Sequence, residues 1–303
     1  MQPALSIIVV NWNTRDLLEQ CLCALERGVP DGNQVEIFVV DNASTDGSGE
    51  MVAGRFEWVH LIANEENVGF ARANNQAILQ SRGRYVLLLN SDTEVRPGAV
   101  ERLLAFMEGR PQAGAAGSRL LNADGSLQLS CHPMLTPERE FWRLIFLDRL
   151  APRATYEMER WETDRPRPVD VIKGACLLLR RSALDEVGLL DEGYFMYTEE
   201  VDLCYRLAAA GWERWWVPQA EVVHYGAASA RQAAQEMYVH LYRSKVRFYR
   251  KFGGAQRVGR FKRFVRLAYW PRLLLSAAGA PFSTRLSQSA QTYRRLLGEL
   301  PAM

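Results

Sequence analysis

The stretch Arg84-Tyr-Val-Leu-Leu-Leu-Asn-Ser-Asp-Thr-Glu94 decides the fold of this chain. Its apolar run, Tyr85 to Leu89, is long enough for a strand buried on both faces, as in a parallel sheet. The run ends in polar residues, which cannot enter an apolar core without partners. Ligands of open α/β sheets bind beyond the carboxyl ends of the strands, so we expect a site here. A carboxylate at such an edge can hold a divalent cation against a phosphate, although a plain strand end followed by a turn is also consistent with the pattern.

Similar strands precede this one along the chain. The sequence predicts strands over residues 5–10, 35–40 and 59–63, each followed by a polar turn, and helices from Thr14 to Gly28 and from Phe70 to Ser81. This alternation predicts an α/β fold with a mostly parallel central sheet and helices on both faces. A dinucleotide-binding fold of the usual kind is disfavoured, because no Gly-x-Gly-x-x-Gly follows the first strand.

The second half of the chain is less regular. The sequence there predicts a helix over 98–108 and a strand over 113–119. Residues 120–168 are expected to form an insertion that either packs on the sheet edge or forms part of a cleft. Residues 169–180 are strand-like but interrupted at Lys173-Gly174. A helix is expected over 199–210, followed by two short strands over 213–218 and 221–225.

Composition restricts the class of protein. With 303 residues that are 48% hydrophobic, the chain can bury a large core. Its five cysteines are an odd number and form no disulfide framework, so we expect packing residues in a reducing cytosol. The sequence predicts no signal peptide, and no apolar run approaches the ~20 residues of a membrane-spanning helix.

The small net charge of +2 hides a division along the chain. Residues 1–236 carry a net charge of −11, whereas residues 237–303 carry +13. From Tyr238 to Tyr269 aromatic and basic residues alternate, and Gly253-Gly254 divides the stretch into two expected helices; residues 267–282 are expected to be broken by Pro271 and Pro281. This pattern suits helices lying on an anionic membrane surface over residues 237–282, or helices that pack on the acidic part in cis or across a homodimer. We expect no nucleic-acid partner, because the acidic part would repel phosphates.

Four polar clusters at element ends could carry chemistry: Asp41-Asn42, Asn90-Ser91-Asp92, Glu199-Glu200 with Asp202, and His224. Each also has a structural explanation, such as a turn cap or the first turn of a helix. Asp202 stands four residues before Arg206 and is expected to pair with it. The clusters point to a function only in combination.

In combination they resemble the inverting glycosyltransferases of family 2, which have the GT-A fold, and in particular the bacterial rhamnosyltransferase-like branch. The resemblance runs from Ser6 to about Ser229. It rests on the segments Ser6-Ile-Ile-Val-Val-Asn-Trp-Asn13, Val40-Asp-Asn-Ala-Ser-Thr-Asp-Gly-Ser48, Asn67-Val-Gly-Phe-Ala-Arg-Ala-Asn-Asn75, Leu89-Asn-Ser-Asp-Thr93, Gly174-Ala175, Phe195-Met-Tyr-Thr-Glu-Glu-Val-Asp-Leu203 and His224.

The resemblance implies a binding pocket for a nucleotide-sugar donor. The residues that would line it are Val10, Asn11, Asn13, Asp41, Asn42, Asn67, Asn90 and Ser91. Asp92 resembles the last residue of the family's Asp-x-Asp motif, which holds Mg²⁺ or Mn²⁺ on the donor diphosphate, and His224 would be a further metal ligand. The cation would neutralise charge on the departing diphosphate.

The sequence departs from the family at two of these positions. Asn90 replaces the first acid of the metal motif, which removes one formal charge. Glu200 stands where the family has its aspartate base, and its longer side chain leaves Glu199 as a second candidate for the base. The implied reaction is a single displacement in which the base takes the acceptor's proton.

The resemblance also implies a domain plan, an acceptor and a location. A catalytic domain would cover residues 1–230, with the nucleotide part at about 1–119 and the acceptor part at about 120–230, and a basic helical extension would cover 231–303. The acceptor would be a glycan or lipid-linked glycan, met in the cytoplasm or peripherally at the inner face of the membrane. dTDP-rhamnose is the favoured donor, ahead of UDP- and GDP-sugars. A sugar-nucleotide nucleotidyltransferase and a non-catalytic sugar- or lipid-binding module are the alternatives.

Overall fold

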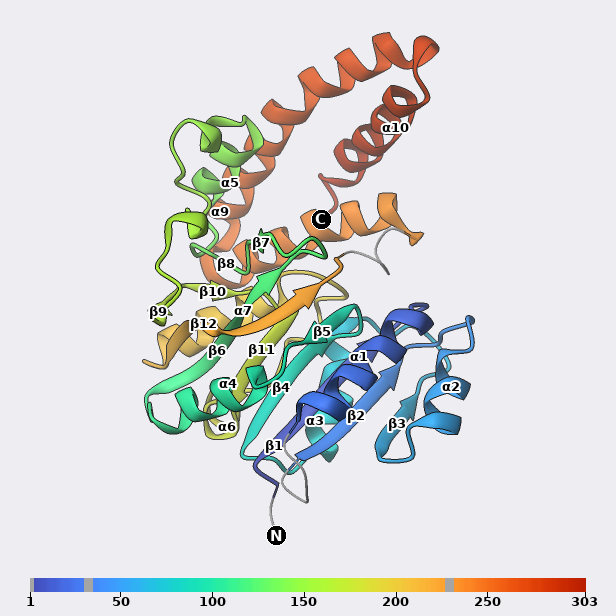
Figure 1. Ribbon diagram of the computed structural model, residues 1–303. Helices are drawn as coiled ribbons and strands as arrows, with labels where there is room; N and C mark the ends of the chain where they lie inside the picture. Colours follow the sequence, from blue (N-terminus) through green and yellow to red (C-terminus); the bar gives the residue numbers. More distant parts are fainter. Residues whose placement is uncertain (1–2, 30–34, 227–231) are drawn as a thin grey trace. The chain divides into compact units, whose positions relative to one another are not determined.

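The computed structural model describes residues 3–29, 35–226 and 232–303 (Figure 1). The chain divides into two compact units. Unit 1 is Met1–His132, Glu157–Phe195 and Glu199–Gln232, and unit 2 is Pro133–Tyr156, Met196–Thr198 and Ala233–Met303. The predicted domain boundary between residues 230 and 231 lies outside the described residues. Residues 133–156, which are part of the predicted insertion, belong to unit 2 together with the C-terminal helices.

Unit 1 is built on one large sheet (Figure 1). In spatial order its strands are β3 (Val59–Ala63), β2 (Val35–Asp41), β1 (Leu5–Asn11), β4 (Tyr85–Asn90), β11 (Cys176–Arg180), β6 (Ala113–Leu121), β12 (Glu213–His224) and β5 (Thr93–Val95), with β7 (Leu127–Gln128) on β6 and β9 (Arg167–Pro168) on β12. A separate pair joins β8 (Cys131–His132) to β10 (Val171–Ile172).

The first four strands are parallel, as predicted from their apolar runs. In register, Asn11 pairs with Asp41 and Val10 pairs with Asn90, so the polar residues that follow β1, β2 and β4 reach the same edge of the sheet. The second half is mixed, since β11 runs antiparallel to both β4 and β6 while β12 runs parallel to β6. The strands that pair in this half are far apart in the sequence, and no local sequence pattern determines whether they run parallel or antiparallel to each other.

Helices cover both faces of the sheet, as the alternation predicts (Figure 1). One apolar cluster joins alternate residues of β1, β2 and β4 to the helices α1 (Arg15–Gly28), α2 (Ser48–Arg55) and α4 (Ala99–Glu108). The other face carries α3 (Phe70–Gln80), α6 (Arg181–Val187) and α7 (Glu199–Ala209). Among the described residues, no helix has an apolar stretch long enough to cross a bilayer.

Several predicted details of unit 1 are wrong. The expected strands 213–218 and 221–225 are one strand, β12, whose register shifts between Val217 and Glu221 around Pro218, a residue that cannot donate to the ladder. Helices α2 and α6 and the three-residue strand β5 are not predicted, because each is too short to show a clear period. The interruption at Lys173-Gly174 is confirmed, since it separates β10 from β11.

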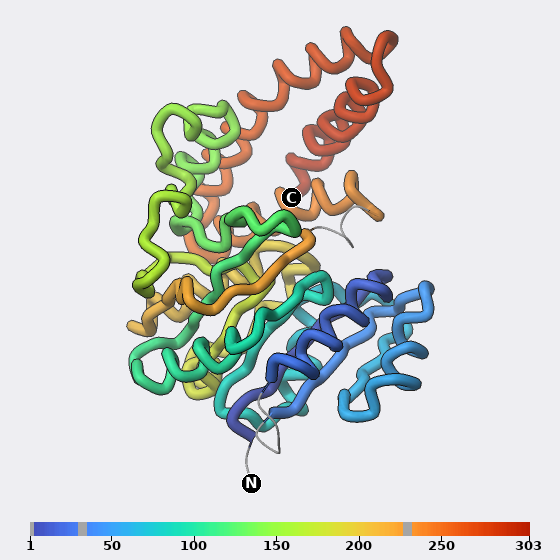
Figure 2. The backbone as a smooth tube through the Cα atoms, viewed as in Figure 1, coloured from blue at the N-terminus to red at the C-terminus, as the bar shows by residue number. Residues whose placement is uncertain are grey.

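Unit 2 is helical. Its elements are α5 (Pro137–Leu144), the short helix η1 (Leu147–Arg149), α9 (Ala234–Gly279), the short helix η3 (Ala280–Phe282) and α10 (Thr284–Glu299). The predicted division of α9 is confirmed, because Gly254 at φ 64° and ψ −171° leaves the helical region there. The expected break at Pro271 is wrong, since the helix continues through it. Figure 2 shows the chain turning back after α9, so that α10 runs beside it.

The aromatic residues of α9 form the core of unit 2. Tyr242, Tyr249, Phe261 and Tyr269 are buried, and their rings contact one another, stacked, tilted or edge-on. These aromatic side chains are therefore packing residues and are not available to a membrane surface. A different set of side chains on α9 is exposed, namely Leu267, Trp270, Leu274 and Leu275.

Candidate active site

The predicted donor-binding residues gather at the carboxyl edge of unit 1's parallel strands. The Asn11 amide Nδ2 donates to Asp41 Oδ1 at 3.1 Å, across the ends of β1 and β2. Asn42 N donates to the Asn11 carbonyl at 2.8 Å, which continues the β1–β2 pairing into the turn. Asn11, Asp41 and Asn42 are all buried. These bonds fix the position of the Asp41 carboxylate at the sheet edge.

The turns after β1 and β2 are held together by side chains. Ser44 Oγ accepts from Asn11 Nδ2 at 3.1 Å and from Asn13 N at 2.9 Å, and Asn13 Oδ1 accepts from Thr45 N at 2.7 Å. Asn13 and Ala43 adopt left-handed backbone conformations, with φ of 51° and 63°. Such conformations are uncommon outside glycine and persist where the surroundings enforce them, often at binding sites.

Asn42 and Asn67 connect the second turn to the loop before α3. Asn42 Nδ2 donates to Asn67 Oδ1 at 2.7 Å, and Asn42 Oδ1 accepts from Asn64 Nδ2 and Val68 N, both at 3.1 Å. The loop ends at Gly69, where φ is 86° and a Cβ would stand 2.6 Å from the Phe195 carbonyl oxygen. The side chains of Asn42 and Asn67 thus shape the rim of the edge, and glycine is required where the loop meets the segment before α7.

Asn90, Ser91 and Asp92 follow β4 at the centre of the sheet. Ser91 Oγ lies 2.9 Å from Thr14 Oγ1, which itself donates to Asn11 Oδ1 at 2.6 Å, so the turns after β1 and β4 are linked. Val10 is the β1 residue paired with Asn90. All eight residues predicted for donor binding therefore lie in the last residues of β1, β2 and β4, in the turns that follow these strands, or in the Asn67 loop that bonds to them.

Asp92 meets His224 in the structure, although one follows β4 and the other ends β12. Asp92 Oδ1 lies 3.2 Å from His224 Nε2, and Asn90 Nδ2 lies 3.3 Å from the same ring nitrogen. Both side chains are mostly buried. Strand β5 makes the meeting possible, because it pairs Thr93 with His224 directly after Asp92.

Gln128 fixes the His224 ring from its other side. Gln128 Nε2 donates to the His224 carbonyl at 3.1 Å and to Asn122 Oδ1 at 2.9 Å, which leaves Oε1 facing His224 Nδ1 at 2.6 Å. An amide oxygen only accepts, so a hydrogen is on Nδ1, and in the neutral form of the ring the lone pair is on Nε2. The lone pair that could bind a metal therefore points toward Asp92.

The Glu199-Glu200 pair opens α7. It follows Tyr197 and Thr198, whose φ values of 66° and 75° are strained for residues with a Cβ. Glu199 is 5% exposed, and burial, and after it the charge of Glu200, raises the pKa of Glu199 well above its ordinary value. Glu200 is only partly buried.

The segment before β11 links Glu200 to Asn90, which neighbours the predicted metal ligands. A Cβ on Gly174 would lie 4.0 Å from Glu200 Cβ, and the neighbouring Ala175 carbonyl accepts from Asn90 N at 3.1 Å. Lys173 also belongs to this region: burial lowers its pKa, while the charge of Glu200 acts in the opposite direction. The structure therefore brings the two predicted clusters to one side of the sheet in unit 1.

Asp202 has the structural role expected of it. Its Oδ1 accepts from Arg206 Nε at 2.6 Å and its Oδ2 from the Tyr194 hydroxyl at 3.1 Å. Four other residues of the site, Thr14, Ser44, Gln128 and Lys173, are not predicted as functional from the sequence. They are single polar residues in loops or, for Gln128, in the two-residue strand β7, and their roles depend on partners distant in sequence.

The predicted metal ligands are only two residues, Asp92 and His224. Within the described residues, no three His, Cys, Asp or Glu side chains come together around one position. Any cation held by Asp92 and His224 would need further oxygen ligands, which a diphosphate could supply.

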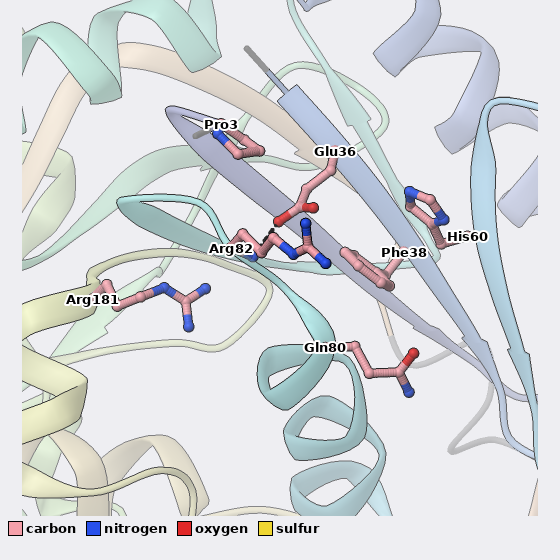
Figure 3. Close-up of a pocket in the computed structure, with 7 residues that line it drawn as sticks. All are labelled: Pro3, Glu36, Phe38, His60, Gln80, Arg82 and Arg181. Atoms are coloured by element: carbon pink, nitrogen blue, oxygen red, sulfur yellow. Dashed lines mark hydrogen bonds between the residues drawn. The ribbon is translucent and has the colours of Figure 1, made fainter. Parts of the chain in front are cut away.

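A pocket of about 900 Å³ lies at the opposite edge of the sheet, near the amino ends of the strands. Figure 3 shows Glu36, Arg82 and Arg181 around it. The Glu36 carboxylate accepts from Ser6 Oγ at 2.6 Å and from Gly83 N at 3.1 Å, and Arg181 Nε donates to the Gly83 carbonyl at 2.6 Å. These charged groups hold the turn before β4, so we assign the pocket no part in the candidate active site.

Comparisons with known proteins show the family and the fold. The sequence profile of the family described as Glycosyl transferase family 2 matches residues 6–188. A relative from Mycobacterium tuberculosis (strain CDC 1551 / Oshkosh), N-acetylglucosaminyl-diphospho-decaprenol L-rhamnosyltransferase, is 34% identical over 79% of this chain and 82% of its own. The low-salt glycan biosynthesis hexosyltransferase Agl10 of Haloferax volcanii is 28% identical over 68% of this chain and 62% of its own.

Solved structures with the same fold include two that contain manganese. Mannosyltransferase PcManGT from Pyrobaculum calidifontis, in complex with GDP-Man and Mn²⁺, has a TM-score of 0.54 at 18% identity and covers 98% of this chain and 86% of its own. GalNAc-T7 with UDP, GalNAc and Mn²⁺ has a TM-score of 0.57 at 17% identity and covers 74% of this chain and 44% of its own. At this identity the likeness shows the fold alone, and it confirms the predicted GT-A class with its helical C-terminal extension.

Proposed function

This chain belongs to glycosyl transferase family 2 and is a glycosyltransferase, and from this premise we propose that it transfers L-rhamnose from dTDP-rhamnose, with inversion, to a lipid-linked glycan. The rhamnosyltransferase relative supports both the sugar and the acceptor class, since its name includes a decaprenol-linked diphosphate sugar. UDP- and GDP-sugars remain the alternative donors. The family match leaves the nucleotidyltransferase and the non-catalytic module without support.

The observation that carries the proposal is the meeting of Asp92 and His224 beside the carboxyl ends of the parallel strands. In our proposal, Asp41, Asn11 and Asn13 receive the base and ribose of the donor, because they lie at the ends of β1 and β2 in an ordered turn. Asn42 and Asn67 form the rim of this pocket. Asn90 and Ser91 lie between the ribose end and the metal-binding pair, where an amide and a hydroxyl can bond ribose or phosphate oxygens.

The residues present fit a divalent cation. A carboxylate oxygen and an unprotonated ring nitrogen face each other at 3.2 Å, close to the ~3 Å between adjacent ligands of an octahedral ion with bonds of ~2.1 Å. Carboxylate oxygen suits both Mg²⁺ and Mn²⁺, and imidazole favours the transition ion. When bound, the cation would supply positive charge against the diphosphate leaving group. Asp92 and His224 would hold it, and Gln128 would orient His224.

We assign the general base to Glu200. Glu199 is buried with a raised pKa, which favours its protonated form and makes it the poorer proton acceptor of the two. Glu200 is partly exposed, where an acceptor hydroxyl can reach it, and the positive charge of Lys173 favours its ionised form. Glu200 takes the acceptor proton as the hydroxyl attacks the anomeric carbon, and the diphosphate leaves from the opposite face. A single displacement inverts the configuration at that carbon.

Membrane attachment and oligomeric state also belong to the proposal. Peripheral attachment at the inner face of the membrane fits a lipid-linked acceptor, and a homodimer is the alternative use of the basic C-terminal helices. Both depend on surfaces of unit 2.

A panel of nucleotide sugars tests the proposed function. The thermal unfolding midpoint is measured with dTDP-rhamnose, UDP-glucose, UDP-N-acetylglucosamine and GDP-mannose, each with and without Mn²⁺, because a bound donor stabilises the folded state by mass action. We expect the largest increase with dTDP-rhamnose and Mn²⁺ together, accompanied by slow release of dTDP. No Mn²⁺-dependent increase with any donor would contradict the proposal, and a larger increase with another donor would reassign the sugar.

A further inference from the structure

Unit 2 contains a pocket of its own, of about 470 Å³, between α5, the turn that follows it, and α9. Basic and aromatic side chains dominate its lining, among them Arg143, Phe146, Arg149, Tyr238, Tyr269 and Arg272. Nothing in the proposed transfer reaction uses this pocket. Its lining must therefore be explained separately.

The pocket has an excess of positive charge. Burial by itself would raise the pKa of Glu140, but the charges of Lys245 and Arg143 hold it to about 2, so this carboxylate is matched by two cations. Glu140 neighbours the pocket without lining it, and the one acid in the lining, Asp148, is engaged by Arg153 N and Ala154 N, both at 2.8 Å. Arg149 and Arg272 instead lie over the Phe146 ring, at 5.2 and 4.8 Å from its centre.

Tyrosine hydroxyls add a hydrogen-bond donor. The Tyr269 hydroxyl bonds to that of Tyr238 and, at 2.6 Å, to that of Tyr242. Burial raises the pKa of Tyr238 and of Tyr242, so these groups keep their protons. All three tyrosines line the pocket, and a neutral hydroxyl can donate a hydrogen bond to a ligand. Guanidinium groups with a neutral hydroxyl donor are suited to a phosphate.

Apolar side chains are exposed on the same elements. Leu267, Trp270, Leu274 and Leu275 follow helical spacing on α9 and are 52–74% exposed. In the turn after α5, Phe146 is 57% exposed and Leu150 is 83% exposed. Phe146 has a φ of 62°, so the backbone is strained where it presents this ring. Arg272 connects α9 to the turn after α5, because it donates a hydrogen bond to the Leu144 carbonyl and lies over the Phe146 ring.

We propose that this pocket binds the phosphate headgroup of an anionic membrane phospholipid, with the lipid chains against the exposed apolar side chains of α9 and the turn after α5. The charge and the exposed apolar side chains each favour this occupant. A free phosphate would make no contact with the apolar side chains, and a neutral lipid would gain nothing from the arginines. The inference deepens the proposed function, since it supplies the surface at which a lipid-linked acceptor is met, but it can be tested without any transfer reaction.

The test is flotation of the full chain with vesicles of phosphatidylcholine alone or mixed with phosphatidylglycerol, in the absence of donor. We expect binding to the anionic vesicles only. Arg149→Gln should lower the partition coefficient about five-fold, as for one arginine near an anionic surface. Leu275→Ser should lower it about ten-fold through lost apolar contact. Both residues are exposed, so the variants should keep the wild-type unfolding midpoint.

Matched variants control for general effects of charge and hydrophobicity. Arg294→Gln removes an exposed arginine of α10 outside the pocket, and Leu79→Ser removes a leucine of unit 1 that is 74% exposed, the same as Leu275. Both should float like the wild type, as should the donor-site variant Asp92→Ala. Equal flotation with neutral vesicles, or test variants that match their controls, would overturn the proposal. Inorganic phosphate that stabilises the protein while the vesicles do not bind would also overturn it, in favour of a soluble phosphate ligand.

Discussion

The carboxylate of Asp92 and the ring of His224 face each other at 3.2 Å, joined by the short strand β5 and oriented by Gln128. The two residues stand 132 positions apart in the sequence, and our proposal assigns them to one cation. It also makes Gln128 part of the site, although it contacts neither a donor nor an acceptor in our proposal.

Gln128→Ala should weaken the use of metal and leave the chemical step intact. Loss of a residue that orients a metal-binding histidine typically costs 10–100-fold in affinity. We expect the Mn²⁺ concentration for half-maximal turnover to rise by that factor, with kcat at saturating Mn²⁺ near the wild-type value. Gln112→Ala is the control, because Gln112 also bonds a backbone carbonyl, at 3.0 Å, but lies away from the site. Identical Mn²⁺ curves for the two variants would remove Gln128 from the site.

Glu200→Gln should lower kcat by ~10²–10⁴, as expected for loss of a positioned general base, with little change in donor affinity. Glu199→Gln should have a much smaller effect, because the amide resembles the protonated acid that we infer there. Rates of transfer at saturating donor distinguish the two. The reverse order would move the base to Glu199.

Glu199 should also make stability depend on pH. Its pKa is raised by burial and by Glu200, so its favourable contribution to the free energy of unfolding is complete below the unfolded pKa of ~4.3 and is lost as the pH rises toward the folded value. The unfolding midpoint of the wild type should therefore fall between pH 5 and pH 8 more than that of Glu199→Gln. Parallel curves for the two proteins would show that Glu199 is ionised in the folded state.

The buried Glu140 should be important for the stability of unit 2. Glu140→Ala leaves Lys245, which is 5% exposed, without its carboxylate, and breaking such a pair costs about 3–5 kcal/mol. Glu138→Ala is the control, since Glu138 forms an exposed pair with Arg260 and should cost at most about 1 kcal/mol. Urea denaturation measures both. Equal losses would show that the buried pair has no special role.

The sequence predicts the parallel half of the sheet well, because its strands are apolar runs that end in polar turns and its helices have a clear period. It predicts Asp92, His224 and the Glu199-Glu200 pair as candidates because each carries a charge or imidazole at an element end. Gln128, Thr14 and Lys173 could not be found this way, since their importance comes from partners far along the chain. For the same reason the sequence does not predict the composition of unit 2. Glu140 on α5 pairs with Lys245 on α9, and no local sequence pattern indicates that residues 133–156 pack with the C-terminal helices.

The most direct test of the central claim is the Mn²⁺ dependence of nucleotide-sugar turnover in the wild type and in Asp92→Ala. We expect metal-stripped wild-type protein to be inactive, to recover fully with Mn²⁺, and to yield a product with inverted anomeric configuration. Asp92→Ala should unfold like the wild type yet lose turnover at least ~10³-fold at every Mn²⁺ concentration, since the charge on the leaving group is no longer neutralised. Near-normal turnover by Asp92→Ala, or full activity without metal, would contradict the account.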